Sequence, residues 1–166
     1  MKKLLFLVLA ALTIEGAFAQ TERKRASPRE TADNELVSVT YGRPYKKGRV
    51  VFGELEKFGS VWRIGADEAT EITFKKDGTF GGQPIKAGTY TMFAIINANE
   101  WEVILNSELK QWGAYGYEKI KGKNVLTTKV PTQKTTSVVE QLTITPGASD
   151  LTIAWDDTMV KIHYKF

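Results

Sequence analysis

Two arginines in a short basic loop are the first residues whose chemistry suggests a binding site. Residues 41–49 read YGRPYKKGR, so Arg43 and Arg49 flank a segment of aromatic, lysine and glycine residues. A guanidinium group offers a planar fork of donors that fits a carboxylate or a phosphate, which predicts an anionic ligand. The alternative is that both arginines pair with acidic residues such as Glu68 and fix the loop to the domain. Ion pairs of that kind are common in proteins, which favours the structural role.

A second segment, residues 61–70 (VWRIGADEAT), combines a large aromatic ring with opposite charges. Trp62 and Arg63 are followed closely by Asp67 and Glu68. Neighbouring residues of an extended chain point to opposite faces, so these two carboxylates reach one pocket only through a bulge. Hydrolysis by a pair of carboxylates therefore needs that bulge or a second carboxylate from elsewhere in the chain. We favour an ion pair between Arg63 and Glu68 that holds a turn.

A third segment, residues 111–117 (QWGAYGY), places Trp112, Tyr115 and Tyr117 among glycine and alanine. Flat rings on a loop of small residues can stack on sugar faces or on the side chains of a protein partner. The alternative is that the rings fold back as a plug over the open end of the domain. Large aromatic side chains gain most from burial, which favours the plug.

The residues needed for metal or nucleophilic catalysis are scarce. The chain has one histidine, His163, and no cysteine, so we expect no metal site. No G-x-S-x-G sequence accompanies the histidine and no glycine-rich phosphate loop occurs, so we expect neither serine-type hydrolysis nor a cofactor. The formal charge of +4 is mild, and we expect no nucleic-acid partner. These observations favour a protein that is not an enzyme.

The elements that must position these segments are predicted to be β-strands. From residue 35 onward apolar residues alternate with other residues, which is typical of strands with one buried face. The alternating groups lie at residues 37–41, 70–74, 90–96, 101–105, 151–155 and 160–164. Turn-forming residues separate them, including residues 97–100 of a predicted hairpin and residues 156–158. The pattern predicts an all-β fold: a single-domain antiparallel β-sandwich, jelly-roll-like and with little helix.

The N-terminal residues predict export. An apolar run at residues 4–14 follows two lysines and precedes a small-x-small cleavage pattern, so residues 1–19 are predicted to be a signal peptide. Residues 20–34 are polar and charged and predict a flexible leader, which leaves residues 35–166 for the sandwich domain. No later segment is long and apolar enough to cross a membrane. Because the chain lacks cysteine, we expect a soluble periplasmic or extracellular protein that is not a cysteine-anchored lipoprotein.

The chain resembles a bacterial family catalogued as domain of unknown function 2911. The resemblance covers nearly the whole chain after the predicted signal peptide. It depends on the segments YGRPYKKGR, FGEL, VWRIGADEAT, AGTYTMFAI, WEVILN and QWGAYGY. Members of that family are exported and uncharacterised, so the resemblance implies a class of protein and no chemistry. Asp67 stands where members of the family more often carry Asn.

Taken together, these features predict a non-catalytic exported domain that binds a small molecule, a glycan or an envelope protein. One alternative is a hydrolase that uses Glu68 or Asp67 with an arginine, and another is a purely structural protein of the envelope. The residues we expect to bind the ligand are Arg43, Arg49, Trp62, Arg63, Glu68, Trp112 and Tyr115. If the protein has such a site, the three segments should meet around it.

Overall fold

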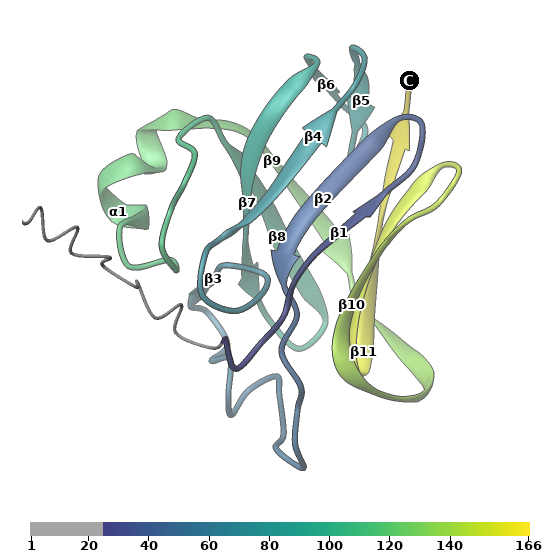
Figure 1. Cartoon of the computed structure of the whole chain (residues 1–166). Helices are drawn as coiled ribbons and strands as arrows, with labels where there is room; N and C mark the ends of the chain where they lie inside the picture. Colours follow the sequence, from purple (N-terminus) through teal and green to yellow (C-terminus); the bar gives the residue numbers. More distant parts are fainter. Residues whose placement is uncertain (1–24) are drawn as a thin grey trace, which may run out of the picture.

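Two antiparallel sheets pack face to face in the computed structural model, which describes residues 25–166 (Figure 1). The all-β sandwich predicted from the alternation is therefore confirmed. The larger sheet runs in the order β1 (Arg29–Asp33), β2 (Val37–Gly42), β4 (Thr70–Phe74), β7 (Gly88–Ile96), β8 (Glu100–Asn106) and β9 (Asn124–Pro131), and the short β3 (Val61–Trp62) also pairs with β7. The smaller sheet runs in the order β10 (Gln133–Pro146), β11 (Asp150–Lys165), β5 (Gly78–Phe80) and β6 (Gln83–Ile85).

Little helix interrupts the strands. The described chain contains one short α-helix, α1 (Tyr117–Ile120), followed by a 3₁₀ turn, η1 (Lys121–Lys123). No helix among residues 25–166 is long and apolar enough to cross a membrane. The predicted signal peptide at residues 1–19 lies outside the described residues.

Burial follows the alternation that predicted the strands. In β2 the side chains of Val37, Val39 and Tyr41 are buried, while the residues between them are half-buried. The predicted hairpin is formed by β7 and β8, where Ile96 pairs with Trp101. At one end of the core the rings of Trp62, Trp101, Trp155 and Phe52 pack against one another, with the Trp62 and Trp155 centroids 6.1 Å apart. The loops at this end of the sandwich pack on the aromatic cluster.

The predicted turn at residues 156–158 is wrong. Residues 150–165 form the single strand β11, and Asp156 within it has a φ of 56°. Pairing with β10 shifts register where Val139 faces Asp156, as at a β-bulge. A bulge adds one residue to the strand, so the buried positions change from odd numbers up to Trp155 to even numbers afterwards. The break in the alternation is therefore a bulge inside one strand.

The predicted leader also ends earlier than expected. Residues 29–33, which we assigned to a flexible segment, form the edge strand β1 and pair with β2 from Arg29 to Asp33. The side chains of β1 are mostly exposed. An edge strand with two solvated faces needs no apolar alternation, so its sequence resembles that of a polar leader.

Candidate functional site

Three chain segments meet at the aromatic end of the sandwich. They are the loop of residues 43–60 between β2 and β3, the loop of residues 63–69 between β3 and β4, and residues 25–28, which lead into β1. Figure 1 shows the 43–60 loop projecting beyond the ends of the sheets. Loops of this kind, held by a rigid sandwich, commonly carry binding residues.

Glycine allows the loop at residues 63–69 to lie directly against β2. The amide of Ala66 donates to the carbonyl of Gly42 at 3.2 Å. A Cβ atom added to Gly42 would lie 2.0 Å from the Ala66 carbonyl oxygen, and one added to Gly65 would lie 2.7 Å from the Gly42 oxygen. The two backbones can approach this closely only because both residues lack a side chain.

Backbone strain is concentrated in the same loops. Lys47, Ile64 and Asp67 have φ values of 50°, 55° and 61°, in the left-handed region. For a β-branched residue such as Ile64 this conformation is rare and costs free energy, and such strain often accompanies functional sites. The Thr70 hydroxyl donates to the Ile64 carbonyl at 2.6 Å and holds it there. Among residues other than glycine, Asn and Asp enter this region most readily, which suits Asp67.

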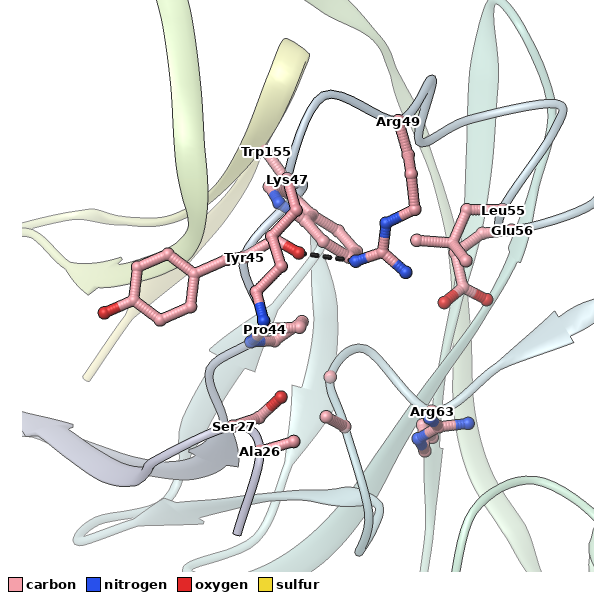
Figure 2. Close-up of a pocket in the computed structure, with 12 residues that line it drawn as sticks. Ala26, Ser27, Pro44, Tyr45, Lys47, Arg49, Leu55, Glu56, Arg63 and Trp155 are labelled. Atoms are coloured by element: carbon pink, nitrogen blue, oxygen red, sulfur yellow. Dashed lines mark hydrogen bonds between the residues drawn. The ribbon is translucent and has the colours of Figure 1, made fainter.

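The loops enclose a cavity of about 300 Å³, called the first cavity below. Figure 2 shows Arg49, Glu56 and Arg63 around its open centre. The other residues that line it are Ala26, Ser27, Pro44, Tyr45, Lys47, Leu55, Gly65, Ala66 and Trp155. Three cationic side chains and one carboxylate therefore face the same space, which gives the cavity a positive balance of charge.

Glu56 is the acidic group of the first cavity, and its environment favours the neutral form. Burial raises the pKa of Glu56 to about 7, although the charges of Arg63 and Arg49 oppose that rise. The indole N–H of Trp62 also lowers the pKa of Glu56, although it forms no hydrogen bond of full geometry within residues 25–166. The carboxyl group can therefore donate or accept a proton near neutral pH.

The two arginines of the first cavity are held differently. Arg49 donates from Nε to the Lys46 carbonyl at 2.7 Å and from Nη2 to the Tyr45 carbonyl at 2.6 Å, so the loop's own backbone fixes it. Arg63 is half-buried, and its Nε atom is fully buried without a hydrogen-bond partner among the described residues. No ion pair formed within residues 25–166 holds its guanidinium group. Because Nε is closed off from the cavity, a ligand would pair with the outer nitrogen atoms of this guanidinium group, which no carboxylate of residues 25–166 holds.

Arg43 and Trp62 lie apart from the first cavity. The Arg43 guanidinium donates to the Leu142 carbonyl at 3.0 Å and to the Thr143 hydroxyl at 3.1 Å, and pairs with Glu30 at 3.0 Å. It therefore links the end of β2 to β10, which is the structural role considered from the sequence. Trp62 is buried in the aromatic cluster beneath the loops.

The ion pair predicted between Arg63 and Glu68 is wrong. Glu68 instead accepts a hydrogen bond from Arg25 Nη1 at 2.6 Å and pairs with Arg29 at 3.2 Å. The hydrogen bond from Arg25 lowers the pKa of Glu68 to about 2. Asp67 also faces Arg25, at 3.8 Å. These carboxylates are occupied by arginines outside the first cavity.

The third predicted segment borders the site without lining the first cavity. Gly113 donates to the Asp67 carbonyl at 2.9 Å, and Trp112 forms a β-bridge with Glu68. The Trp112 side chain is 62% exposed and Tyr115 is 85% exposed. The plug that we favoured from the sequence is therefore wrong for these two rings, which face solvent. Tyr117, the third aromatic residue of the segment, is buried against Phe93, with the ring centroids 5.2 Å apart.

Sequence reasoning did not identify Glu56. It follows the FGEL segment in a loop of alternating charged and apolar residues, where a solvated glutamate is the ordinary expectation. Its burial arises only because the loop folds back onto Trp62 and Arg63.

The fold and the cavity define a β-sandwich with a positively charged pocket formed by its end loops. The chain matches the family described as "Protein of unknown function (DUF2911)" over residues 24–164, and it belongs to that family. The match confirms the resemblance and covers both the sandwich and the loops of the site. Comparison with curated proteins and with solved structures finds no match.

Proposed function

We propose that this protein is exported and that its first cavity binds a small molecule carrying an acidic group. The observation that carries the proposal is the Arg63 guanidinium, which lines the cavity half-buried and forms no ion pair within residues 25–166. Arg49 and Lys47 add positive charge to the same space. An anionic group would pair with these cations in a site partly removed from water, where charge-assisted hydrogen bonds are strong.

The cavity also suggests what else the ligand carries. Glu56 faces the arginines and, with a pKa near 7, can both donate and accept hydrogen bonds. A ligand with a hydroxyl group beside its acidic group, such as a sugar acid or a hydroxy acid, would hydrogen-bond to Glu56 and pair with the arginines. The volume of about 300 Å³ suits a ligand of one sugar ring.

Binding is better supported than hydrolysis. Glu56 is the one carboxylate among the residues that line the first cavity. Glycoside hydrolysis by the common mechanism uses two carboxyl groups that flank the bond to be broken. Asp67 and Glu68, the pair considered from the sequence, are engaged by Arg25 instead.

Calorimetric titration with glucuronate, citrate and inorganic phosphate tests the proposal, with neutral glucose as the comparison ligand. We expect at least one of the anions to bind and Arg63→Met to weaken it by at least about tenfold, because a hydrogen bond to a charged group contributes about 1.5–3 kcal/mol. Arg29→Met is the matched control, since Arg29 is partly buried but pairs with Glu68 outside the cavity. Equal losses in both variants, or binding that Arg63→Met leaves intact, would contradict the proposal.

A further inference from the structure

A second cavity of about 420 Å³ lies on the other side of the 43–60 loop. Its walls come from that loop, from the turn between β7 and β8, from β10 and from the bulge of β11. The residues that line it are Lys46, Val50, Phe52, Phe58, Asn97, Ala98, Trp101, Lys134, Val138, Asp156, Asp157 and Thr158. None of them lines the first cavity, so the two cavities can be tested separately.

The charges of the second cavity cancel. Lys46 pairs with Asp156 at 2.7 Å, and Lys134 pairs with Asp157 at 2.6 Å. The Lys46–Asp156 pair is mostly buried, and Asp156 also accepts from the Val51 amide at 3.2 Å, so this pair belongs to the framework. The Lys134–Asp157 pair is exposed and offers donors and acceptors to a ligand. A cavity with two cations and two carboxylates selects a neutral ligand, in contrast to the first cavity.

The rim of the second cavity is apolar and open to solvent. Phe58 is 46% exposed, and Val50 and Val138 are 51% and 62% exposed. Beneath them lies Trp101, which is fully buried and whose indole N–H has no hydrogen-bond partner among the described residues. Exposed apolar side chains are unfavourable in water, and a ligand with an apolar face would cover them. The Trp101 indole is closed off from the cavity, so the ligand would contact the rim and not this N–H group.

We infer that the second cavity binds a neutral saccharide. The C–H face of a sugar ring packs on Phe58, because the ring is flat, exposed and at the rim. Sugar hydroxyl groups donate and accept at the same atom, which suits a carboxylate and an ammonium group side by side at Asp157 and Lys134. The inference uses no residue of the first cavity and stands if the proposed anion site fails.

Titration of the isotope-labelled full chain with maltotriose, cellotriose and chitotriose, followed by NMR, tests the inference. We expect one of these neutral trisaccharides to shift the resonances of residues that line the second cavity. Phe58→Ala should then weaken binding about tenfold through loss of the aromatic contact. Asp157→Asn should weaken it at least about threefold through loss of an acceptor, without removing the ring.

Asp77→Asn is the matched control, since Asp77 and Lys86 form an equally exposed pair at 2.7 Å elsewhere on the surface. That variant should bind the trisaccharide as the unchanged protein does. The inference is overturned if no trisaccharide binds at millimolar concentration, or if Phe58→Ala and Asp157→Asn both bind normally. Loss of saccharide binding in Arg63→Met would place the sugar in the first cavity and overturn the inference as well.

Discussion

Replacing Glu56 by glutamine should stabilise the protein at pH 8 and leave its stability unchanged at pH 4. Burial raises the pKa of Glu56 in the folded protein to about 7, whereas its ordinary value is 4.5. Between these pH values the folded chain holds a proton that the unfolded chain has released, so the unchanged protein loses stability as the pH rises. Glutamine does not titrate, so the Glu56→Gln variant escapes that loss.

The size of the effect follows from the two pKa values. They differ by about 2.5, which corresponds to about 3 kcal/mol if the whole difference is retained. Because Glu56 is not fully buried, we expect a gain of about 2 kcal/mol for Glu56→Gln above pH 7. For a domain of this size that gain would raise the melting temperature by roughly 4–8 °C.

Urea unfolding at pH values from about 4 to 8.5, followed by tryptophan fluorescence, measures the effect. The difference in unfolding free energy between Glu56→Gln and the unchanged protein should rise from near zero and level off above pH 7. Glu54→Gln, an exposed glutamate of the same loop, is the control and should show no such rise. A difference for Glu56→Gln that is flat across this range would refute the reasoning that Glu56 is buried beside Trp62 and Arg63.

Two further substitutions test the framework of the site. Glu68→Gln should cost about 0.5–1 kcal/mol at pH 7 and much less near pH 2. Arg25 lowers the pKa of Glu68 from 4.5 to about 2, so the stability that this partly exposed pair contributes is lost as the pH falls through that range. Urea unfolding at both pH values would measure the cost, and an equal cost at both would contradict the expectation. Gly42→Ala should cost about 2–3 kcal/mol, because the added Cβ would lie 2.0 Å from the Ala66 oxygen. Gly122→Ala is the control and should be tolerated, since its Cβ would have no atom within 4 Å. Calorimetric melting compares the two variants, and similar melting temperatures would show that the loop moves freely away from β2.

The strands that the sequence predicts are those with one buried face. Residues 70–74 alternate because one side of β4 packs on the core. Residues 90–96 also alternate and form β7, although residues 91–94 of that strand are buried on both faces because Phe93 packs in a second cluster with Ile104 and Tyr117. The edge strand β1 is mostly exposed and places only Ala32 against the core, so its residues carry no period. At residues 156–158 the sequence shows a break in phase, which a turn and a bulge produce equally. Only the pairing of β10 with β11 distinguishes them.

Part of the candidate site was also predictable from the sequence. The segments at residues 41–49 and 61–70 were identified by glycine and arginine, and both contribute to the first cavity, through residues such as Arg49 and Arg63. Their partner Glu56 comes from a loop whose composition is ordinary for an exposed segment. Its pKa depends on the fold of the loop, because Trp62 and Arg63 approach it from another segment. Spacing along the chain cannot reveal such an environment.

The 43–60 loop forms a wall of both cavities and influences the charge of each. Lys46 lines the second cavity and Lys47 lines the first, so the loop divides its positive charge between two sites. Lys46 is neutralised by Asp156, whose φ of 56° belongs to the bulge that fixes the change of phase in β11. Lys47 has no such carboxylate among the lining residues except Glu56, whose pKa near 7 leaves it partly protonated at neutral pH. The bulge therefore makes one cavity neutral, and the burial of Glu56 keeps the other positive.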